Sequence, residues 1–297
     1  MQPSDAGSRA NTLQEAAGPL PGDLLWIGPV ADDELALARE CIAGMVGVVE
    51  AASPAAAVES PPAAFRDRSP VAILLASPIP ATWTLADGIA LSRRWPLAPL
   101  VSVAATLVEG RRRSGPALPG IEEVAWNELP ARLAWWLHDR ERGLPGGLGM
   151  PATARREERV LEASKRVADR NVRSGRPIAV AAPRPLDVEG IVDLLTAAGR
   201  AVVRRTCGRP AIDELADVIV WDVAAITPTD LTWLAMVAAN RPAAAIILLD
   251  SFPRGETTRA ALRAGARAVL SRPVSLEALT GTLLDLDRPT GRPASRL

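Results

Sequence analysis

The stretch IAVAAPRPLDVEGIVDLLTAAG, residues 178–199, decides the fold of this chain. Its first five residues form a short apolar run, which is typical of a buried strand. Its second half has apolar residues at helical spacing and ends at Gly199, a residue that favours helix termination. A strand that leads directly into an amphipathic helix is the building unit of a parallel sheet covered by helices. The rest of the chain is therefore expected to repeat this unit.

The C-terminal half does repeat it. Beyond residues 178–199, apolar runs predict four more strands and apolar periodicity predicts further helices. The strands are at 201–205, 217–222, 245–249 and 268–271, and the helices at 229–240, 256–264 and 276–286. We interpret this half as five strands alternating with five helices, which is a doubly wound sheet.

The N-terminal half follows the same order. Its predicted strands are 24–27, 45–50, 71–76, 100–104 and 123–126, and its predicted helices are 32–43, 85–93 and 129–138. LLWIG corresponds to IAVAAP, AILLAS to VIVWDV, LVSVAA to IILLDS, and EEVAW to ARAVL. An arginine-rich loop, 109–120, replaces the fourth helix. This pattern predicts an internal repeat at the scale of a domain.

The expected organisation is therefore two α/β domains joined by a linker, as 297 residues also favour. We expect a flexible tail over 1–22, a first domain over 23–142, a linker with a solvated helix over 143–176, a second domain over 177–287 and a tail over 288–297. The linker helix, within 154–172, has one apolar stripe and could brace one domain on the other.

Composition excludes several classes of function. The chain has 34 basic and 34 acidic residues, so no overall charge attracts it to nucleic acid or to an anionic membrane. Residues 1–22 have neither a basic start nor an apolar run, so we expect a cytoplasmic protein. Zinc-ligand spacing, glycine-rich nucleotide loops and catalytic triads are missing from the sequence, so we expect no enzyme. Cys41 and Cys207 are expected to be buried free thiols.

The C-terminal half resembles the receiver domain of response regulators, the CheY-like fold with flavodoxin-like strand order 2-1-3-4-5. The resemblance covers residues 177–286. IAVAAPRPLDVEGIVDLL, 178–195, resembles the first strand, acidic turn and first helix of that family, and AGARAVLSRPVSLEAL, 264–279, resembles its last strand and helix. VIVWDV places Asp222 where the family keeps its phosphoacceptor aspartate. The repeat extends the resemblance to a degenerate tandem pair.

The resemblance implies chemistry that this sequence has partly lost. Receivers hold Mg²⁺ with an acidic pair after the first strand, because the ion must neutralise the incoming phosphoryl group. Here Ala182 and Pro183 match that pair, and Arg184 follows as a permanent cation. We therefore expect no metal and no other cofactor. Mg²⁺ would be needed only if Asp222 were still phosphorylated.

Other family positions have changed as well. Asp250 matches the hydroxyl residue that contacts the phosphoryl group, and it would repel a phosphate on Asp222. Ser251 could supply that hydroxyl if the alignment slipped by one residue. Arg272 matches the family's lysine and keeps an affinity for anions. Together with Arg184 these residues form either a phosphate or anion site, or a salt-bridge network that fixes the loops.

In the N-terminal half the corresponding positions are further from the family pattern. Ala76 replaces the phosphoacceptor, Gly28 and Pro29 occupy the acidic turn, and Glu128 or Asn127 occupies the lysine position. Asp32 and Asp33 lie just downstream, where capping of the helix that they begin is a sufficient role.

Three further features are open to two interpretations. EGRRRSG, residues 109–115, could bind phosphate or an acidic partner, or be a solvated loop. Trp126, Trp135 and Trp136 could anchor an interface or pack in the core. His138, the single histidine, suits the end of a helix electrostatically and has no partner that would make it catalytic.

We therefore predict a non-enzymatic signalling protein, a tandem pseudo-receiver that binds another signalling protein or a copy of itself. Little or no phosphoacceptor activity is expected. The alternative is an active response regulator that a histidine kinase phosphorylates on Asp222. A pairing of Arg184 with Asp222 is expected to lock the first kind of protein in one state.

Overall fold

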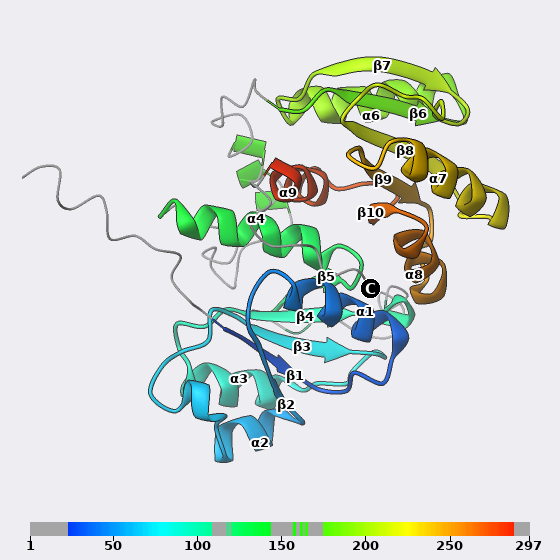
Figure 1. The fold of residues 1–297 in the computed structure, drawn as a ribbon. Coiled ribbons are helices and arrows are strands. Elements are labelled where there is room, and N and C mark those ends of the chain that lie inside the picture. Colours follow the sequence, from blue (N-terminus) through cyan, green and yellow to red (C-terminus); the bar gives the residue numbers. More distant parts are fainter. Residues whose placement is uncertain are drawn as a thin grey trace, which may run out of the picture.

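The computed structural model describes residues 23–108, 118, 120–143, 157–158, 161–162, 164–165 and 175–287. The two predicted tails, most of the arginine-rich loop and most of the linker with its helix lie outside these residues. What is described forms two α/β units (Figure 1). We call residues 23–143 the N-terminal unit and residues 175–287 the C-terminal unit.

The N-terminal unit contains five strands and four α-helices among its described residues. The strands are β1 (Leu24–Ile27), β2 (Val48–Ala51), β3 (Ile73–Ser77), β4 (Leu100–Ala104) and β5 (Glu122–Ala125). The helices are α1 (Asp33–Ala43), α2 (Pro54–Glu59), α3 (Leu85–Arg94) and α4 (Leu129–Glu141), with a short 3₁₀ helix, η1 (Ala63–Phe65).

The C-terminal unit contains five strands and four helices in residues 175–287. The strands are β6 (Ile178–Ala182), β7 (Val202–Cys207), β8 (Val218–Ala224), β9 (Ala245–Asp250) and β10 (Ala266–Ser271). The helices are α6 (Pro185–Ala197), α7 (Pro228–Asn240), α8 (Gly255–Arg263) and α9 (Leu276–Asp287).

Both sheets are parallel throughout and have the same strand order. The N-terminal sheet runs β2-β1-β3-β4-β5 and the C-terminal sheet runs β7-β6-β8-β9-β10. Read in chain order within each unit, both are 2-1-3-4-5, so the predicted doubly wound fold is confirmed for both halves. The central strands are buried on both faces, which explains why they read as continuous apolar runs.

Local capping helps to begin the helices where the sequence changes from strand to helix. Asp32 caps α1 by accepting hydrogen bonds from the amides of Glu34 at 2.9 Å and Leu35 at 3.2 Å, so its predicted capping role is confirmed. Thr84 and Thr227 begin the matching helices α3 and α7, and each forms a capping box with an aspartate three residues later. The two units thus share a capping device at the same place in the fold.

The structure corrects two element predictions. It contains α2 and η1 between β2 and β3, where no helix was predicted, because the stretch has little apolar periodicity and ends at Pro61 and Pro62. In the C-terminal unit there are four helices and not five, since residues 208–217 connect β7 to β8 without a helix. Gly208, with φ +102°, and Pro210 interrupt this connection, which is too short to repay helix nucleation.

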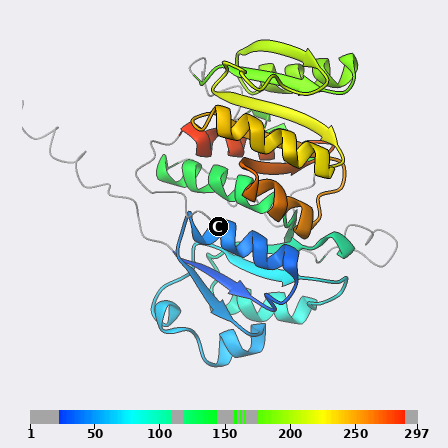
Figure 2. The ribbon, with the colours of Figure 1, turned by 45° about the vertical axis from the view of Figure 1, so that its right-hand side comes forward.

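The two units pack against each other mainly through their last helices. Figure 1 and Figure 2 both show α4 of the N-terminal unit beside α9 of the C-terminal unit, and α1 close to α8. The helices approach closely at Gly281 of α9, where an added Cβ atom would overlap the backbone carbonyl of Ala131. Arg132 forms an ion pair with Glu277, and Arg259 forms one with Glu40 at 2.9 Å.

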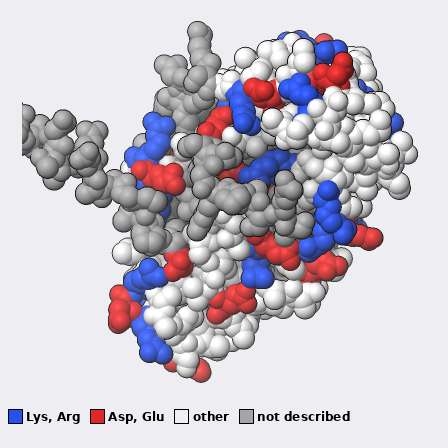
Figure 3. Space-filling view, in the orientation of Figure 1, with Lys and Arg blue, Asp and Glu red and all other residues white. Residues whose placement is uncertain are grey.

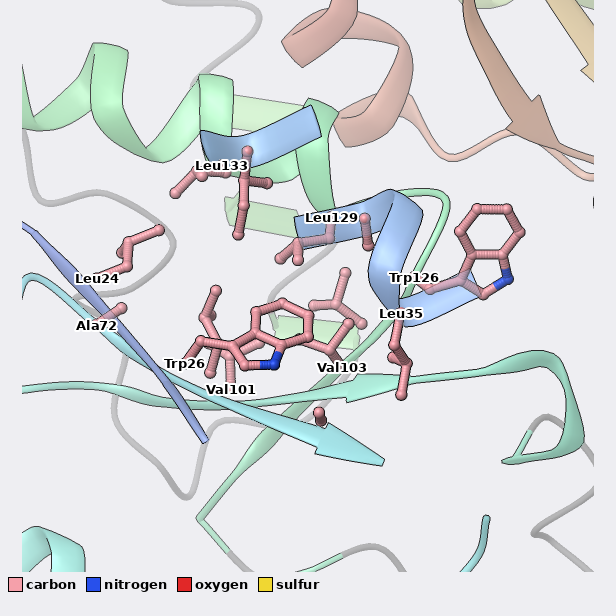
Figure 4. Close-up of a cluster of buried hydrophobic side chains, with 14 of the residues drawn as sticks. Leu24, Trp26, Leu35, Ala72, Val101, Val103, Trp126, Leu129 and Leu133 are labelled. Atoms are coloured by element: carbon pink, nitrogen blue, oxygen red, sulfur yellow. The ribbon is translucent and has the colours of Figure 1, made fainter. Parts of the chain in front are cut away.

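The three tryptophans divide between core and interface. Trp126 and Trp136 belong to the core of the N-terminal unit, which Figure 4 shows between α4 and the sheet, with Trp26 and Leu133 among its members. Trp135 instead packs against Ala198 and Leu284 of the C-terminal unit. Core packing is therefore the right interpretation for Trp126 and Trp136, and interface packing is the right one for Trp135.

The two cysteines and the histidine differ in how well the sequence predicted their places. Both cysteines are free, but Cys207 is exposed at the end of an edge strand, so its predicted burial is wrong. Cys41 is only partly exposed, and burial raises the pKa of its thiol to about 11. His138 lies in the last turn of α4 as expected.

Among the described residues, no helix combines the length and hydrophobicity needed to cross a bilayer. Acidic and basic side chains are interspersed on the face in Figure 3.

The contact at Gly281 leads to a stability prediction. The variant G281A should lower the free energy of unfolding by about 1–3 kcal/mol, because α4 and α9 must separate to admit the methyl group. Gly190, inside α6, is the matched control, since an added Cβ there meets nothing within 4 Å. G190A should stabilise the protein by roughly 0.5–1 kcal/mol. Urea unfolding followed by tryptophan fluorescence measures both, and equal effects would contradict the close packing.

Candidate functional site

Asp222 lies at the carboxyl end of β8, in the middle of the C-terminal sheet. Its residue is 1% exposed. One carboxylate oxygen, Oδ1, accepts a hydrogen bond from the amide of Ala224 at 3.0 Å. Ala224 has a φ of +57°, a left-handed conformation that is unusual for a residue with a side chain. The strand thus ends in a tight turn that folds its own amide back onto the carboxylate.

Arg272, just after β10, supplies the positive charge for Asp222. Its Nη1 lies 3.0 Å from both carboxylate oxygens and has good hydrogen-bond geometry to Oδ1. Its Nη2 donates to Oδ1 of Asp187 at 3.1 Å. One guanidinium therefore bridges two carboxylates that come from different elements. Fork-like donation of this kind is what arginine does well and lysine does not.

Asp187 is the member of the site that sequence reasoning missed. It lies in the first turn of α6 and also accepts two hydrogen bonds from Arg184, at 2.8 and 3.0 Å. Its position three residues after Arg184, on the same helix face, was the available signal. The expected pairing of Arg184 with Asp222 is wrong: Arg184 pairs with Asp187, and Arg272 takes Asp222.

The side chains of Asp250 and Ser251 make no bond to this network, but the carbonyl of Asp250 accepts a hydrogen bond from the amide of Arg272 at 2.8 Å. Asp250 is 4% exposed, and its Oδ1 accepts a hydrogen bond from the amide of Phe252 at 3.1 Å. In the sheet it lies opposite Ala224 and not opposite Asp222. Ser251 is exposed, and its amide donates to the carbonyl of Ala224 at 2.8 Å. These two residues hold the loops after β8 and β9 together.

Burial and hydrogen bonding perturb the carboxyl groups in opposite directions. Burial raises the pKa of Asp222, although the amide of Ala224 and the charge of Arg272 oppose that rise. Burial likewise raises the pKa of Asp250 against the hydrogen bonds from backbone amides. The hydrogen bond from Arg184 lowers the pKa of the more exposed Asp187. The ionised form is therefore disfavoured at Asp222, the deepest carboxylate of the network.

The residues present do not fit a magnesium ion. Mg²⁺ needs several oxygen ligands in near-octahedral geometry. Of the two carboxylates in the network, Asp222 is bonded to Arg272, and Asp187 is bonded to both Arg272 and Arg184. Ala182 ends β6 without a carboxylate. Across the described part of the chain, no group of three or more His, Cys, Asp or Glu side chains could hold a metal ion.

The corresponding place in the N-terminal unit is filled by an indole ring. Gly28 has a φ of +110°, and an added Cβ would lie 2.6 Å from the ring of Trp83. The Nε1 of Trp83 donates a hydrogen bond to the carbonyl of Ala76 at 2.9 Å. The ring therefore packs where the resemblance would put an acidic turn and a phosphoacceptor. Trp83 was not singled out from the sequence.

Glu128, at the position of the family's lysine in this unit, faces the other unit. Its Oε1 accepts a hydrogen bond from the hydroxyl of Ser271, at 3.2 Å. Ser271 immediately precedes Arg272. The neighbouring Asn127 is buried.

Comparison with known proteins finds similar solved structures. A protein named for pilus assembly from Burkholderia thailandensis is 26% identical over 37% of this chain and 97% of its own, with a TM-score of 0.35. The signal receiver domain of an HD domain-containing protein from Pseudomonas fluorescens is 19% identical over 38% of this chain and 94% of its own, with a TM-score of 0.32.

Both sheets have the strand order of the receiver fold. An atypical orphan response regulator with a phosphorylation-independent mechanism is also similar, at 12% identity over 37% of this chain and 93% of its own, with a TM-score of 0.31. Each likeness spans little more than a third of this chain, about the length of one unit. No family model matches the chain, and no curated protein matches it in sequence.

The two arginines of the network should differ in their effect on stability. R272Q leaves the buried charge of Asp222 without its cation and should lower the free energy of unfolding by about 1–3 kcal/mol at neutral pH. R184Q is the control, since Arg184 is 73% exposed and leaves the pair of Arg272 and Asp222 intact. It should cost little, because water screens the ion pairs of an exposed side chain. Urea unfolding distinguishes the two, and similar costs would contradict this assignment.

The cost of R272Q should also depend on pH. Because the pKa of Asp222 is raised in the folded state, its contribution to stability is present below its unfolded pKa and is lost as pH rises through the folded pKa. Removing Arg272 raises that pKa further, so the variant should lose most stability where Asp222 is ionised. The difference from the wild type should shrink between about pH 7 and pH 4. If the difference in the free energy of unfolding between wild type and R272Q stayed constant over this range, ionisation of Asp222 would not be its cause.

Proposed function

We propose that this chain is a signalling protein of the response-regulator type whose receiver-like units act as a protein-binding platform, with little or no phosphoacceptor activity. One observation carries the proposal: the guanidinium of Arg272 is bonded to both Asp222 and Asp187. A nucleophilic carboxylate must reach the phosphorus atom with a metal ion beside it. Here a protein cation already takes the place that the ion would need.

Three further features support this proposal. The two carboxylates of the network do not fit Mg²⁺, for the reasons given above. In the N-terminal unit, Trp83 fills the matching place and Ala76 offers no nucleophile. The formal charge of zero does not favour nucleic acid as a partner. Output through contact with another signalling protein, or with a second copy of the chain, needs neither a cofactor nor turnover.

The alternative is an active response regulator that accepts phosphate on Asp222 from a histidine kinase. One observation favours it: Oδ2 of Asp222 accepts no hydrogen bond with acceptable geometry from any described residue. If Arg272 swung away from this oxygen, the carboxylate would be open to attack a phosphoryl donor. Mg²⁺ would then have to be recruited by Asp222 and Asp187. The two functions therefore differ in whether Asp222 is phosphorylated in the presence of Mg²⁺.

Incubation with Mg²⁺ and acetyl phosphate tests the proposal. Intact-mass spectrometry should show no phosphate adduct on the wild type beyond the level in D222A, because Asp222 is paired with Arg272 and the carboxylates of the network do not fit Mg²⁺. A hydroxylamine-sensitive adduct that is present in the wild type and absent in D222A would establish the alternative. A known receiver domain in the same mixture confirms that the donor is active.

A further inference from the structure

The segment that carries Arg272 is held at both ends by the N-terminal unit. At one end, the hydroxyl of Ser271 donates a hydrogen bond to Oε1 of Glu128 at 3.2 Å. At the other end, Glu277 forms an ion pair with Arg132. Only residues 272–276 lie between these two contacts. The position of the Arg272 guanidinium therefore depends on a segment whose flanks are bonded to another part of the protein.

Both anchors come from one rigid element. Glu128 and Arg132 are one helical turn apart at the start of α4, and the amide of Arg132 donates to the carbonyl of Glu128 at 2.9 Å. Arg132 also pairs with Glu122 of β5 and lies over the ring of Trp136, 5.5 Å from its centroid. Its side chain is only 12% exposed. The first turn of α4 thus presents two fixed polar groups to the C-terminal unit.

Apolar contacts complete the attachment. Leu276, at the start of α9, packs against the cluster that contains Trp135 of α4. One turn and a half further along α9, Gly281 meets the backbone of Ala131. Polar anchors on a short segment are effective when the helix behind them cannot move, because little entropy is then left to lose.

We propose that the N-terminal unit is a clamp that holds the Arg272 guanidinium on Asp222, so that docking of the two units and the pairing of Asp222 are coupled. The inference rests on the proposed function, in which the pair of Arg272 and Asp222 keeps the site closed. Glu128, at the position that matches Arg272 in the other half, is the positioning residue of this clamp. A partner protein that competes for the first turn of α4 would release Arg272, and release of Arg272 would weaken the docking in turn.

The test uses the full chain and reads the titration of Asp222 from its carboxyl carbon by NMR. The charged groups around Asp222 are Arg272 after β10 and Asp187 and Arg184 at the start of α6, with Asp250 of β9 bonded to its own loop. R272Q should raise the pKa of Asp222, because the cation is lost. That shift sets the scale for the other variants.

E128A and E128Q form a matched pair. Both remove the negative charge of Glu128, which by itself would lower the pKa of Asp222. Only E128A removes the acceptor for Ser271, so it should raise the pKa of Asp222 by a substantial part of the shift in R272Q, whereas E128Q should not. S271A removes the same hydrogen bond without changing any charge and should behave like E128A.

The clamp is overturned if E128A and S271A leave the pKa of Asp222 unchanged or lower it, or if R272Q does not raise it. NMR signals of the core residues of the N-terminal unit should stay at their wild-type positions in each variant, which excludes unfolding as the cause. The failure of the proposed function has a different signature, which is phosphate on Asp222 of the wild type. A chain that accepts phosphate and still shows the E128A shift has a clamp that regulates real phosphorylation.

Discussion

A buried carboxylate at the end of a central strand must be neutralised or bonded, and most of this site follows from how that is achieved for Asp222. Leaving such a group ionised without a partner costs more than a typical hydrogen bond contributes. Here Arg272 provides the charge and the amide of Ala224 provides a hydrogen bond. Arg272 can also reach Asp187, so the strand end, the first turn of α6 and the segment after β10 form one connected unit.

Under the proposed function, the guanidinium of Arg272 takes the role that a metal ion has in receivers. A hydrated dication needs several oxygen ligands and leaves when phosphate or ligands leave. A guanidinium is attached to the backbone, is always charged and satisfies two carboxylates at once. The proposed function therefore predicts a site of fixed geometry and not one suited to reversible chemistry. Any switching must then come from movement of the segment that carries Arg272, and that segment is bonded to α4.

The N-terminal unit has the same strand order as the C-terminal unit but different residues at its strand ends. Trp83 packs against Gly28 and donates a hydrogen bond to the carbonyl of Ala76, so its ring fills this part of the carboxyl end of the sheet. The same unit contributes α1 and α4 to the contact with α8 and α9. Side chains on its surface of contact bond to the C-terminal unit, among them Glu128 to Ser271 and Glu40 to Arg259. This is consistent with a role as a support for its neighbour.

Sequence reasoning was most successful for elements whose signals are local. Strands β1, β4 and β6 begin and end where the apolar runs predicted, because a parallel strand buried on both faces is a nearly continuous apolar run. Helix α2 was missed, since six residues followed by two prolines carry no periodicity. In the site, Asp222 and Arg272 were predicted from the resemblance, while Asp187 was not, because its role depends on two arginines that arrive from different directions.

The sequence by itself therefore determined the two doubly wound sheets and the lack of carboxylates at Ala182 and Pro183, since these follow from short stretches of residue type, and the resemblance to receivers supplied the strand order. Only the tertiary structure decided which arginine pairs with which aspartate, and which tryptophan packs at the contact between the two units. It also decided that Glu128 reaches Ser271 of the other unit. Those contacts join residues up to about half the chain apart, and their choice depends on helix packing and side-chain reach, which no local pattern encodes.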